Sequence, residues 1–402
     1  MADTLLPVAD ARHLVHSTIK PVEAEHIKLR HALGRVIAEN SVARVSHPPA
    51  DLAAMDGYAI RTSDLVSLPT KINIVGESAA GQPWKGKLNS GECIRIFTGA
   101  IVPETADAVV IQENTTAENG LVQINRPLIK GKNIRARAQD FYKGEAILKY
   151  PHMLNARDIG LLAAMNLPEV KVYRRPRIGV LSTGNEILQP GETISEGQIF
   201  SANGPGLCAF IESKGAQAFN LGIVPDNLSK LRDAIKRSGE LDMLVSSGGV
   251  SVGDHDLVKR AAIEEGLQIY FHKIAMRPGK PLLYGTLKNM PFFGLPGNPV
   301  SAMVCAVIFL GPAIAMLSGL PGDAPESLTA RLSNDIAANN DREHYIRAVL
   351  QRSESGLPTV TSLTNQDSAL IKLLSEANAL ICHAPHAEAL SNGSPVRVIP
   401  LT

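Results

Sequence analysis

The central third of the chain alternates short apolar runs with helix-like stretches, and this alternation limits the fold more than any other feature. The apolar runs of strand length are 177–181, 219–224, 241–245 and 281–286. The helix-like stretches between them are 203–214, 228–239 and 256–265. Strands that alternate with helices form a mostly parallel sheet with right-handed connections. The sequence therefore predicts a doubly wound α/β domain over residues 176–323.

Two glycine-rich loops follow strands of this predicted sheet. The loop at 182–186 follows the first strand, and the loop at 246–256 follows the strand at 241–245. In an open α/β sheet, ligands bind outside the carboxyl ends of the strands. Glycines there allow backbone N–H groups to face an anion, and carboxylates can hold a divalent cation. The loops are therefore the first candidate site, although neither matches a Walker loop or a Gly-x-Gly-x-x-Gly fingerprint.

The charged residues near these loops each have a structural and a functional interpretation. Glu186 could reach a metal or a substrate hydroxyl, or it could cap a helix or be solvated. Asp254 and Asp256 begin the next predicted helix, so one could cap it while the other faces a ligand. A later loop with two prolines carries three cations, which favours an oxyanion or phosphate site over an ordinary surface loop. These cations are Lys273, Arg277 and Lys280.

The segments on either side of the α/β domain have different patterns. Residues 46–140 alternate β-like runs with turns, which predicts an inserted β-rich domain. Residues 324–402 return to short β-like runs, which predicts a small C-terminal β-barrel or sandwich. Residues 1–45 and 141–175 are expected to form a helical or extended linking domain. Its predicted helices are 8–20, 33–38 and 153–165.

Three polar residues of the inserted domain have ordinary structural explanations. Asp56 and Thr98 lie in stretches compatible with tight turns. Asp140 follows Arg135 and Arg137, so an ion pair would explain it.

Composition excludes some classes of partner. A net charge of +1 provides no basic field for nucleic acid, and 4% aromatic residues argue against a base-stacking platform. The four cysteines are far apart, which is typical of reduced thiols in a cytoplasmic protein. No secretory signal is visible, and the Cys-His segment at 382–386 lacks a second cysteine pair for a metal site. The uncharged stretch 300–320 is long enough to span a membrane, but Gly311 and Pro312 interrupt it, which favours a buried core helix.

Six strings occur in one order along the chain. They are MDGYA at 55–59, RIFTGA at 95–100, STGNE at 182–186, SSGGVSVG at 246–253, RPGKP at 277–281 and LPGNP at 295–299. Each is weak alone, but together they closely resemble the molybdopterin molybdenumtransferase family, which includes bacterial MoeA and the gephyrin E domain. The resemblance covers nearly the whole chain.

This resemblance implies a reaction and an assembly. Members of the family insert molybdenum from molybdate into adenylylated molybdopterin and release AMP, with Mg²⁺ required. The resemblance also implies a homodimer in which the partner's β-rich domain completes each active site. Transient partners would be a molybdopterin adenylyltransferase and apo-molybdoenzymes.

By position, the resemblance also assigns roles to individual residues. The residues that would face the partner's cleft are Asp56, Thr98 and Asp140. The acids that would line the α/β cleft are Glu186, Asp226 and Asp256, with Glu186 and Asp256 as metal ligands. The ligand-binding positions would be Gly248, Gly249, Ser251, Lys273, Arg277, Lys280, Pro296, Pro299, Arg347 and Ser368. Arg347 and Ser368 match family positions associated with molybdate.

The sequence departs from the family pattern at four positions. Asn185 stands where many members have Asp, Arg277 where Lys is usual, Ser201 where Asp is frequent, and Asp367 where Gly is commoner. An acid at 367 should weaken anion binding if its side chain points inward. Three alternatives therefore stay open: a tungstate-preferring homologue, an enzyme that adenylylates molybdopterin, and a non-catalytic scaffold of the same fold.

Overall fold

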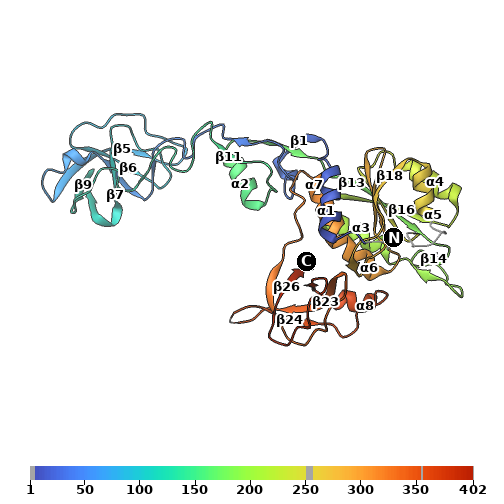
Figure 1. Ribbon diagram of the computed structural model, residues 1–402. Helices are drawn as coiled ribbons and strands as arrows, with labels where there is room; N and C mark the ends of the chain where they lie inside the picture. The colour runs from blue at the N-terminus through green and yellow to red at the C-terminus, as the bar shows by residue number, and fades with distance from the viewer. Residues whose placement is uncertain (1–4, 250–256, 355, 402) are drawn as a thin grey trace.

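The protein is elongated, with its β-rich domain at one end and its α/β domain at the other. In the computed structural model (Figure 1), described residues are 5–249, 257–354 and 356–401. A narrow linking region joins the two ends, and the C-terminal β domain lies beside the α/β domain. The inserted β-rich domain is therefore far from the α/β domain of the same chain.

The α/β domain contains a six-stranded mixed sheet in the order β16-β13-β17-β21-β20-β18. Its strands are β13 (Arg177–Thr183), β16 (Gln217–Val224), β17 (Met243–Ser247), β18 (Leu267–Phe271), β20 (Leu283–Leu287) and β21 (Met290–Leu295). The first four strands in the sheet order pair in parallel, and β20 and β18 add antiparallel pairs. The helices are α3 (Asn203–Ser213), α4 (Leu228–Arg237) and α5 (Leu257–Glu264). The strands β14 (Ile187–Leu188) and β15 (Ile199–Phe200) form a small separate pair.

The apolar stretch near residue 310 is a helix of the core. It runs as α6 (Pro299–Cys305), a π-helical turn at Ala306–Leu310 and α7 (Gly311–Leu317). Proline has no N–H for the regular helical ladder, and the π turn ends two residues before Pro312. In the described part of the chain, Pro299–Leu317 is the one helix long and apolar enough to cross a membrane, and 72% of its most apolar window is buried inside the molecule. This burial agrees with the predicted core helix.

The inserted domain is built on a six-stranded sheet with apolar side chains on both faces. Its strands are β4 (Gly57–Ile60), β5 (Thr70–Ser78), β6 (Glu92–Ile96), β7 (Ala108–Ile111), β8 (Thr115–Glu118) and β9 (Leu121–Ile124). Neighbouring residues of β6 face opposite sides: Cys93 packs in one cluster and Ile94 in the other. This two-sided core lets the domain fold at a distance from the rest of the chain.

The linking domain combines helices with short strand pairs. Its elements are α1 (Val8–Thr18), β1 (Ala24–Lys28), β2 (Ser41–Val42), β11 (Ala146–Leu148), α2 (Ala156–Ala164) and β12 (Glu169–Tyr173). The predicted helix at 33–38 is wrong, because Val36 and Ile37 make β-bridges to Met153 and Val172. Both are β-branched and buried, and such side chains pack well on extended backbone.

The C-terminal domain is a small closed barrel. Its strands are β22 (Leu328–Leu332), β23 (Glu343–Gln351), β24 (Thr359–Ser362), β25 (Ala379–His383) and β26 (Pro395–Pro400). Pairing of β23 with β25 closes the sheet, and the short strand β19 (Met276–Arg277) of the α/β domain pairs with β23. The predicted fold class, a doubly wound α/β domain with a β-rich insertion and a C-terminal barrel, is confirmed. The β19–β23 pairing fixes the barrel against the α/β domain and so shapes the site between them.

Candidate functional site

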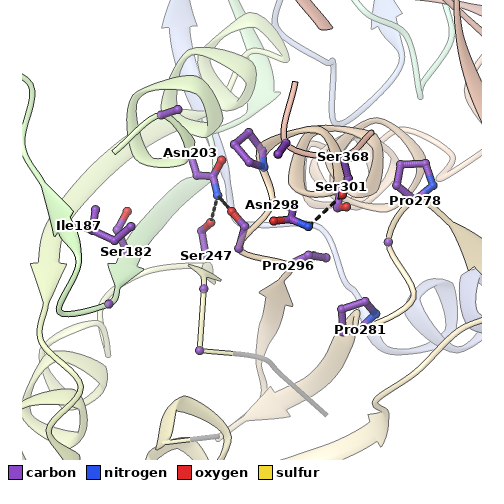
Figure 2. A pocket seen from close by; sticks show the side chains of 18 of the residues that line it. Ser182, Ile187, Asn203, Ser247, Pro278, Pro281, Pro296, Asn298, Ser301 and Ser368 are labelled. Carbon is purple, nitrogen blue, oxygen red and sulfur yellow. Dashed lines mark hydrogen bonds between the residues drawn. The ribbon is translucent and has the colours of Figure 1, made fainter. Parts of the chain in front are cut away.

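A cavity of about 1210 Å³ lies between the α/β domain and the C-terminal barrel. One wall consists of the loops that follow β13, β17 and β21, as expected for the carboxyl ends of strands. The opposite wall comes from the loop after β19, the start of β23 and the segment 366–371. Segments far apart in the sequence therefore meet around one volume (Figure 2).

The glycines after β17 allow close approach to the backbone. Gly248 and Gly249 have φ of +87° and +66°, which favours residues without a Cβ. A Cβ on Gly248 would lie 2.6 Å from the carbonyl oxygen of Thr183, and one on Gly249 would lie 2.3 Å from a methyl of Val258. Thr183 lines the cavity with a buried hydroxyl that has no hydrogen-bond partner within the described residues. The sequence thus creates a polar floor of backbone and hydroxyl groups.

Asn203, at the start of α3, holds two of these loops together. Its side-chain nitrogen donates to Ser247 Oγ at 2.7 Å and to the carbonyl oxygen of Gly297 at 2.7 Å (Figure 2). The loop after β17 is thereby tied to the loop after β21. These two hydrogen bonds therefore fix the relative positions of two backbone segments that face the cavity.

A second amide connects the two domains. Asn298 Nδ2 donates to Ser368 Oγ at 2.9 Å (Figure 2). The N–H of Val300 donates to the Ser368 carbonyl at 3.2 Å. Pro296 and Pro299 flank this contact and also line the cavity. Ser368 is thus held at the boundary between α6 and the barrel.

The carboxylates of the α/β wall lie at its exposed rim. Glu186 and Asp226 both line the cavity and are exposed. Asn185 Oδ1 accepts a hydrogen bond from the N–H of Asp226 at 3.1 Å, so the asparagine supports the loop that carries this acid. Two carboxylates that share one rim fit the oxygen preference of Mg²⁺, which proteins often hold with one or two carboxylates and substrate phosphates. In the parts of the chain that the structure describes, no cluster of three His, Cys, Asp or Glu side chains suits a metal.

The opposite wall is rich in cations. Arg277 and Lys280 extend from β19 and the loop after it, and Arg342 and His344 extend from the start of β23. Burial, together with the smaller effect of the neighbouring Arg277, His383 and Arg342, lowers the pKa of His344 to about 4. The wall therefore suits a negatively charged ligand.

Arg347 is buried beneath this wall. Its side chain is 1% exposed and donates to the backbone carbonyls of Asn365 at 3.1 Å, Asp367 at 2.9 Å and Leu370 at 3.2 Å. Its own N–H donates to Gln366 Oε1 at 2.9 Å. Burial lowers its pKa, but an arginine remains charged. Arg347 thus supports the loop that presents Ser368 and is not among the cavity-lining residues.

Asp367 lines the cavity next to Ser368 and is exposed. Its Oδ1 accepts the N–H of Ala369 at 2.8 Å, which fixes the turn. The carboxylate therefore adds negative charge to a wall that is otherwise positive.

The residues of the inserted domain are brought together elsewhere. Asp56 Oδ1 accepts the N–H and the hydroxyl of Thr98, both at 2.7 Å, and these hydrogen bonds hold the Asp56 pKa below its usual value. Arg95 stacks between the rings of Tyr58 and Phe97 at 5.1 and 5.0 Å and lowers that pKa further. None of these side chains lines the cavity, which lies at the other end of the elongated molecule (Figure 1).

The predicted site residues fall into three groups. Those that line the cavity are Glu186, Asp226, Gly248, Gly249, Arg277, Lys280, Pro296, Pro299 and Ser368. Those placed elsewhere are Asp56, Thr98, Asp140, Lys273 and Arg347. Ser251 and Asp256 lie outside the described residues, as does Asp254.

Sequence reasoning assigned no role to several polar residues that the fold brings to the cavity. Thr183 and Ser247 end strands of the α/β domain, Asn203 begins α3 and Asn298 precedes α6, whereas Arg342 and His344 belong to the barrel. The two basic residues are separated by one position at the start of a β-like run, and that spacing was a usable signal for a shared face.

Comparison with known proteins gives the family of this chain. Residues 6–166 match "MoeA N-terminal region (domain I and II)", residues 179–316 match "Probable molybdopterin binding domain", and residues 329–401 match "MoeA C-terminal region (domain IV)". A molybdopterin molybdenumtransferase of Haemophilus influenzae is 35% identical over 94% of both chains. The chain belongs to the molybdopterin molybdenumtransferase family. This family consists of transferases, which agrees with the predicted class of enzyme.

Other relatives extend over nearly the whole chain. A molybdopterin molybdenumtransferase of Bacillus subtilis is 31% identical over 98% of this chain and 94% of its own. The crystal structure of a molybdopterin biosynthesis MoeA protein from Pyrococcus horikosii is 29% identical, with a TM-score of 0.87 over 99% of this chain and 100% of its own. The family resemblance inferred from the six strings is therefore confirmed.

Proposed function

We propose that this transferase inserts molybdenum from molybdate into adenylylated molybdopterin and releases AMP. The observation that carries the proposal is the cavity between the α/β domain and the barrel. There a floor of glycine backbone and hydroxyl groups faces a wall of cations, in a chain of this family. Such a cavity suits a ligand with phosphate groups together with an oxyanion.

The residues of the cavity would act by electrostatics and position. The backbone at Gly248 and Gly249 and the hydroxyl of Thr183 would bind phosphate oxygens. Lys280 and Arg277 would stabilise the charge that builds as the phosphate bond of the adenylate breaks, because fixed cations in a sheltered site stabilise such charge strongly. This mechanism uses no protein nucleophile. It agrees with the buried cysteines, since burial raises the pKa of the Cys93 and Cys305 thiols and keeps them protonated.

Glu186 and Asp226 would hold Mg²⁺ together with Asp256. When bound, Mg²⁺ would neutralise charge on the phosphate oxygens of the adenylate. The rim position of the two carboxylates would place them beside phosphates that enter from solvent. Arg277 and Arg342 of the opposite wall would also bind the molybdate oxygens.

We also propose that the active site is shared between two chains. The Asp56–Thr98 pair is exposed and its carboxylate has a lowered pKa, which suits a functional anion, yet it lies far from the cavity of its own chain. A homodimer would let this pair, and Asp140 of the same domain, face the partner's cavity. Transient contacts would supply the adenylylated substrate from an adenylyltransferase and deliver product to apo-molybdoenzymes. Four free cysteines support a reducing, cytoplasmic location.

The chemistry is tested by product formation. The protein, Mg²⁺, adenylylated molybdopterin and molybdate are incubated, and the product is measured by activation of an apo-molybdoenzyme. Lys280→Met should reduce the rate strongly, whereas Lys71→Met, which removes an exposed cation of the inserted domain, should leave it unchanged. Full activity of Lys280→Met would contradict the role of the cation wall.

The shared site is tested with mixed dimers. Asp56→Asn and Glu186→Gln should each inactivate the protein, because each removes one part of every site. Co-expression of the two variants should restore part of the activity, since a mixed dimer contains one intact site. Mixed dimers that form but stay inactive would contradict the sharing of sites between chains.

A further inference from the structure

The pairing of β19 with β23 places an arginine beside a histidine at the cavity. In this parallel pair, Arg277 is the register partner of His344. Register partners in a sheet present their side chains to the same face. Both residues line the cavity, so the α/β domain and the barrel each contribute one group to the same small area.

The strand β23 separates its charges by face. Glu343 alternates with its two neighbours, and its carboxylate accepts a hydrogen bond from Arg397 at 3.3 Å. His344 lies on the other side of the strand and lines the cavity, and Arg342, which directly precedes the strand, lines it too. The carboxylate of Glu343 is therefore paired with Arg397 away from the cavity, whereas Asp341, just before the strand, lies 4.0 Å from the guanidinium of Arg342 and offsets part of its charge.

The groups around His344 are mostly basic. Arg277 and Lys280 line the cavity from the β19 segment, and Arg342 lines it from the position just before β23. His383 is the cross-strand partner on β25, is 3% exposed and has its ring Nε2 at 3.2 Å from the carbonyl of Glu388.

The acids that line the same cavity lie on other segments. They are Asp367 on the barrel and Glu186 and Asp226 on the rim of the α/β domain. Burial, and after it the basic neighbours, lower the pKa of His344 to about 4, which favours the neutral imidazole near pH 7.

We propose that His344, Arg277 and Arg342 form a subsite for a tetrahedral oxyanion, and that binding of the anion protonates His344. The proposal rests on the proposed function, in which molybdate is the oxyanion. A neutral imidazole can donate one hydrogen bond, whereas an imidazolium donates two and adds a positive charge. The bound dianion supplies the negative charge that the empty cavity lacks beside His344. The proton comes from solvent, so binding of the anion and uptake of a proton are linked.

The sign of the pH effect follows from this linkage. Since the empty site holds a neutral imidazole and the bound site a charged one, affinity rises as the pH falls. The rise is at most about tenfold per pH unit for a single proton, within the interval between the free and the bound pKa. Above the bound pKa the imidazole is neutral in both states, and the dependence disappears.

The test is calorimetric titration of the whole protein with molybdate. Titrations are made in buffers of different ionisation enthalpy between about pH 6 and pH 8, where molybdate remains a dianion and histidine normally titrates. The change of the observed binding enthalpy with the ionisation enthalpy of the buffer gives the number of protons taken up. We expect a fractional proton uptake that increases as the pH falls. The affinity for molybdate should accordingly depend more steeply on pH at the acid end of the range.

Two variants assign the proton to its residue. His344→Gln should bind molybdate more weakly at the acid end of the range and take up no proton. His386→Asn is the matched control, because it removes an exposed imidazole of the same barrel where φ is +57°, a conformation that asparagine tolerates. It should keep the uptake and affinity of the original protein. Thermal unfolding establishes that both variants are folded.

The outcomes separate this inference from the proposed function. Proton uptake that persists in His344→Gln would overturn the role of His344. Molybdate-dependent cofactor formation without any proton uptake would leave the proposed function intact and overturn the inference alone. Failure of the protein to bind molybdate at all would overturn the oxyanion subsite itself.

Discussion

Replacement of Arg347 by lysine distinguishes support of the site from direct contact with its ligand. The guanidinium is 1% exposed and donates to three backbone carbonyls spread over residues 365–370. Lysine keeps the charge, but its ammonium is a point that cannot replace a planar fork across separate acceptors. We therefore expect Arg347→Lys to lose two of the three hydrogen bonds.

The size of the effect follows from those hydrogen bonds. A hydrogen bond to a charged group contributes about 1.5–3 kcal/mol. The loss of two therefore destabilises the folded conformation of the loop and the barrel by a few kcal/mol. If about 1.4 kcal/mol of this loss falls on the loop that holds Ser368, molybdate binding weakens about tenfold. The rest appears as lower stability of the barrel.

Hydrogen exchange and titration measure the two parts. The peptide that contains residues 365–370 should exchange faster in Arg347→Lys, and the dissociation constant for molybdate should rise about tenfold. Arg331→Lys is the matched control, because Arg331 is an exposed arginine of the same barrel that contacts the Gly393 carbonyl at 3.3 Å outside the cavity. Loss of molybdate binding with unchanged exchange in 365–370 would refute the reasoning and make Arg347 a direct ligand.

Three further substitutions test other parts of the account. Asp367→Asn should tighten molybdate binding by about threefold, because it removes one exposed negative charge beside the anion, and such a charge pair has an effect of this size. Titration with molybdate measures the change, and weaker binding would contradict the placement of this acid. Gly249→Ala should lower the thermal stability and abolish activity, because φ is +66° and a Cβ would lie 2.3 Å from a valine methyl of α5; normal activity would contradict this. Asn155→Ala removes the N-cap of α2, where the side chain accepts from Arg157 N at 2.9 Å, and should cost about 1 kcal/mol by denaturant unfolding without altering molybdate binding.

The α/β part of the site was predictable because its signals are local. Glycines just past a strand end allow positive φ and close approach of a ligand to the backbone, and Gly248 and Gly249 do have positive φ. Arg277 and Lys280 stand in a loop stiffened by prolines and reach the cavity. In each case a short stretch of sequence determines both the backbone and the side chain.

The barrel part was harder to predict because it depends on contacts between distant segments. Arg347 has the residue type of an anion ligand, but only the converging carbonyls of 365–370 reveal that its charge is used internally. His344 becomes a site residue through the pairing of β19 with β23, which no local pattern encodes. The incorrect helix at 33–38 has the same origin, since Val36 and Ile37 are extended by partners far along the chain.

The most direct test of the central claim is release of AMP from adenylylated molybdopterin. The protein is incubated with this substrate and Mg²⁺, with molybdate, with tungstate and with neither. The account predicts molybdate-dependent AMP release, with cofactor that activates an apo-molybdoenzyme. Release with tungstate alone would keep the mechanism and change the metal. Tight binding of the adenylate without AMP release under any condition would contradict the account and favour a non-catalytic scaffold.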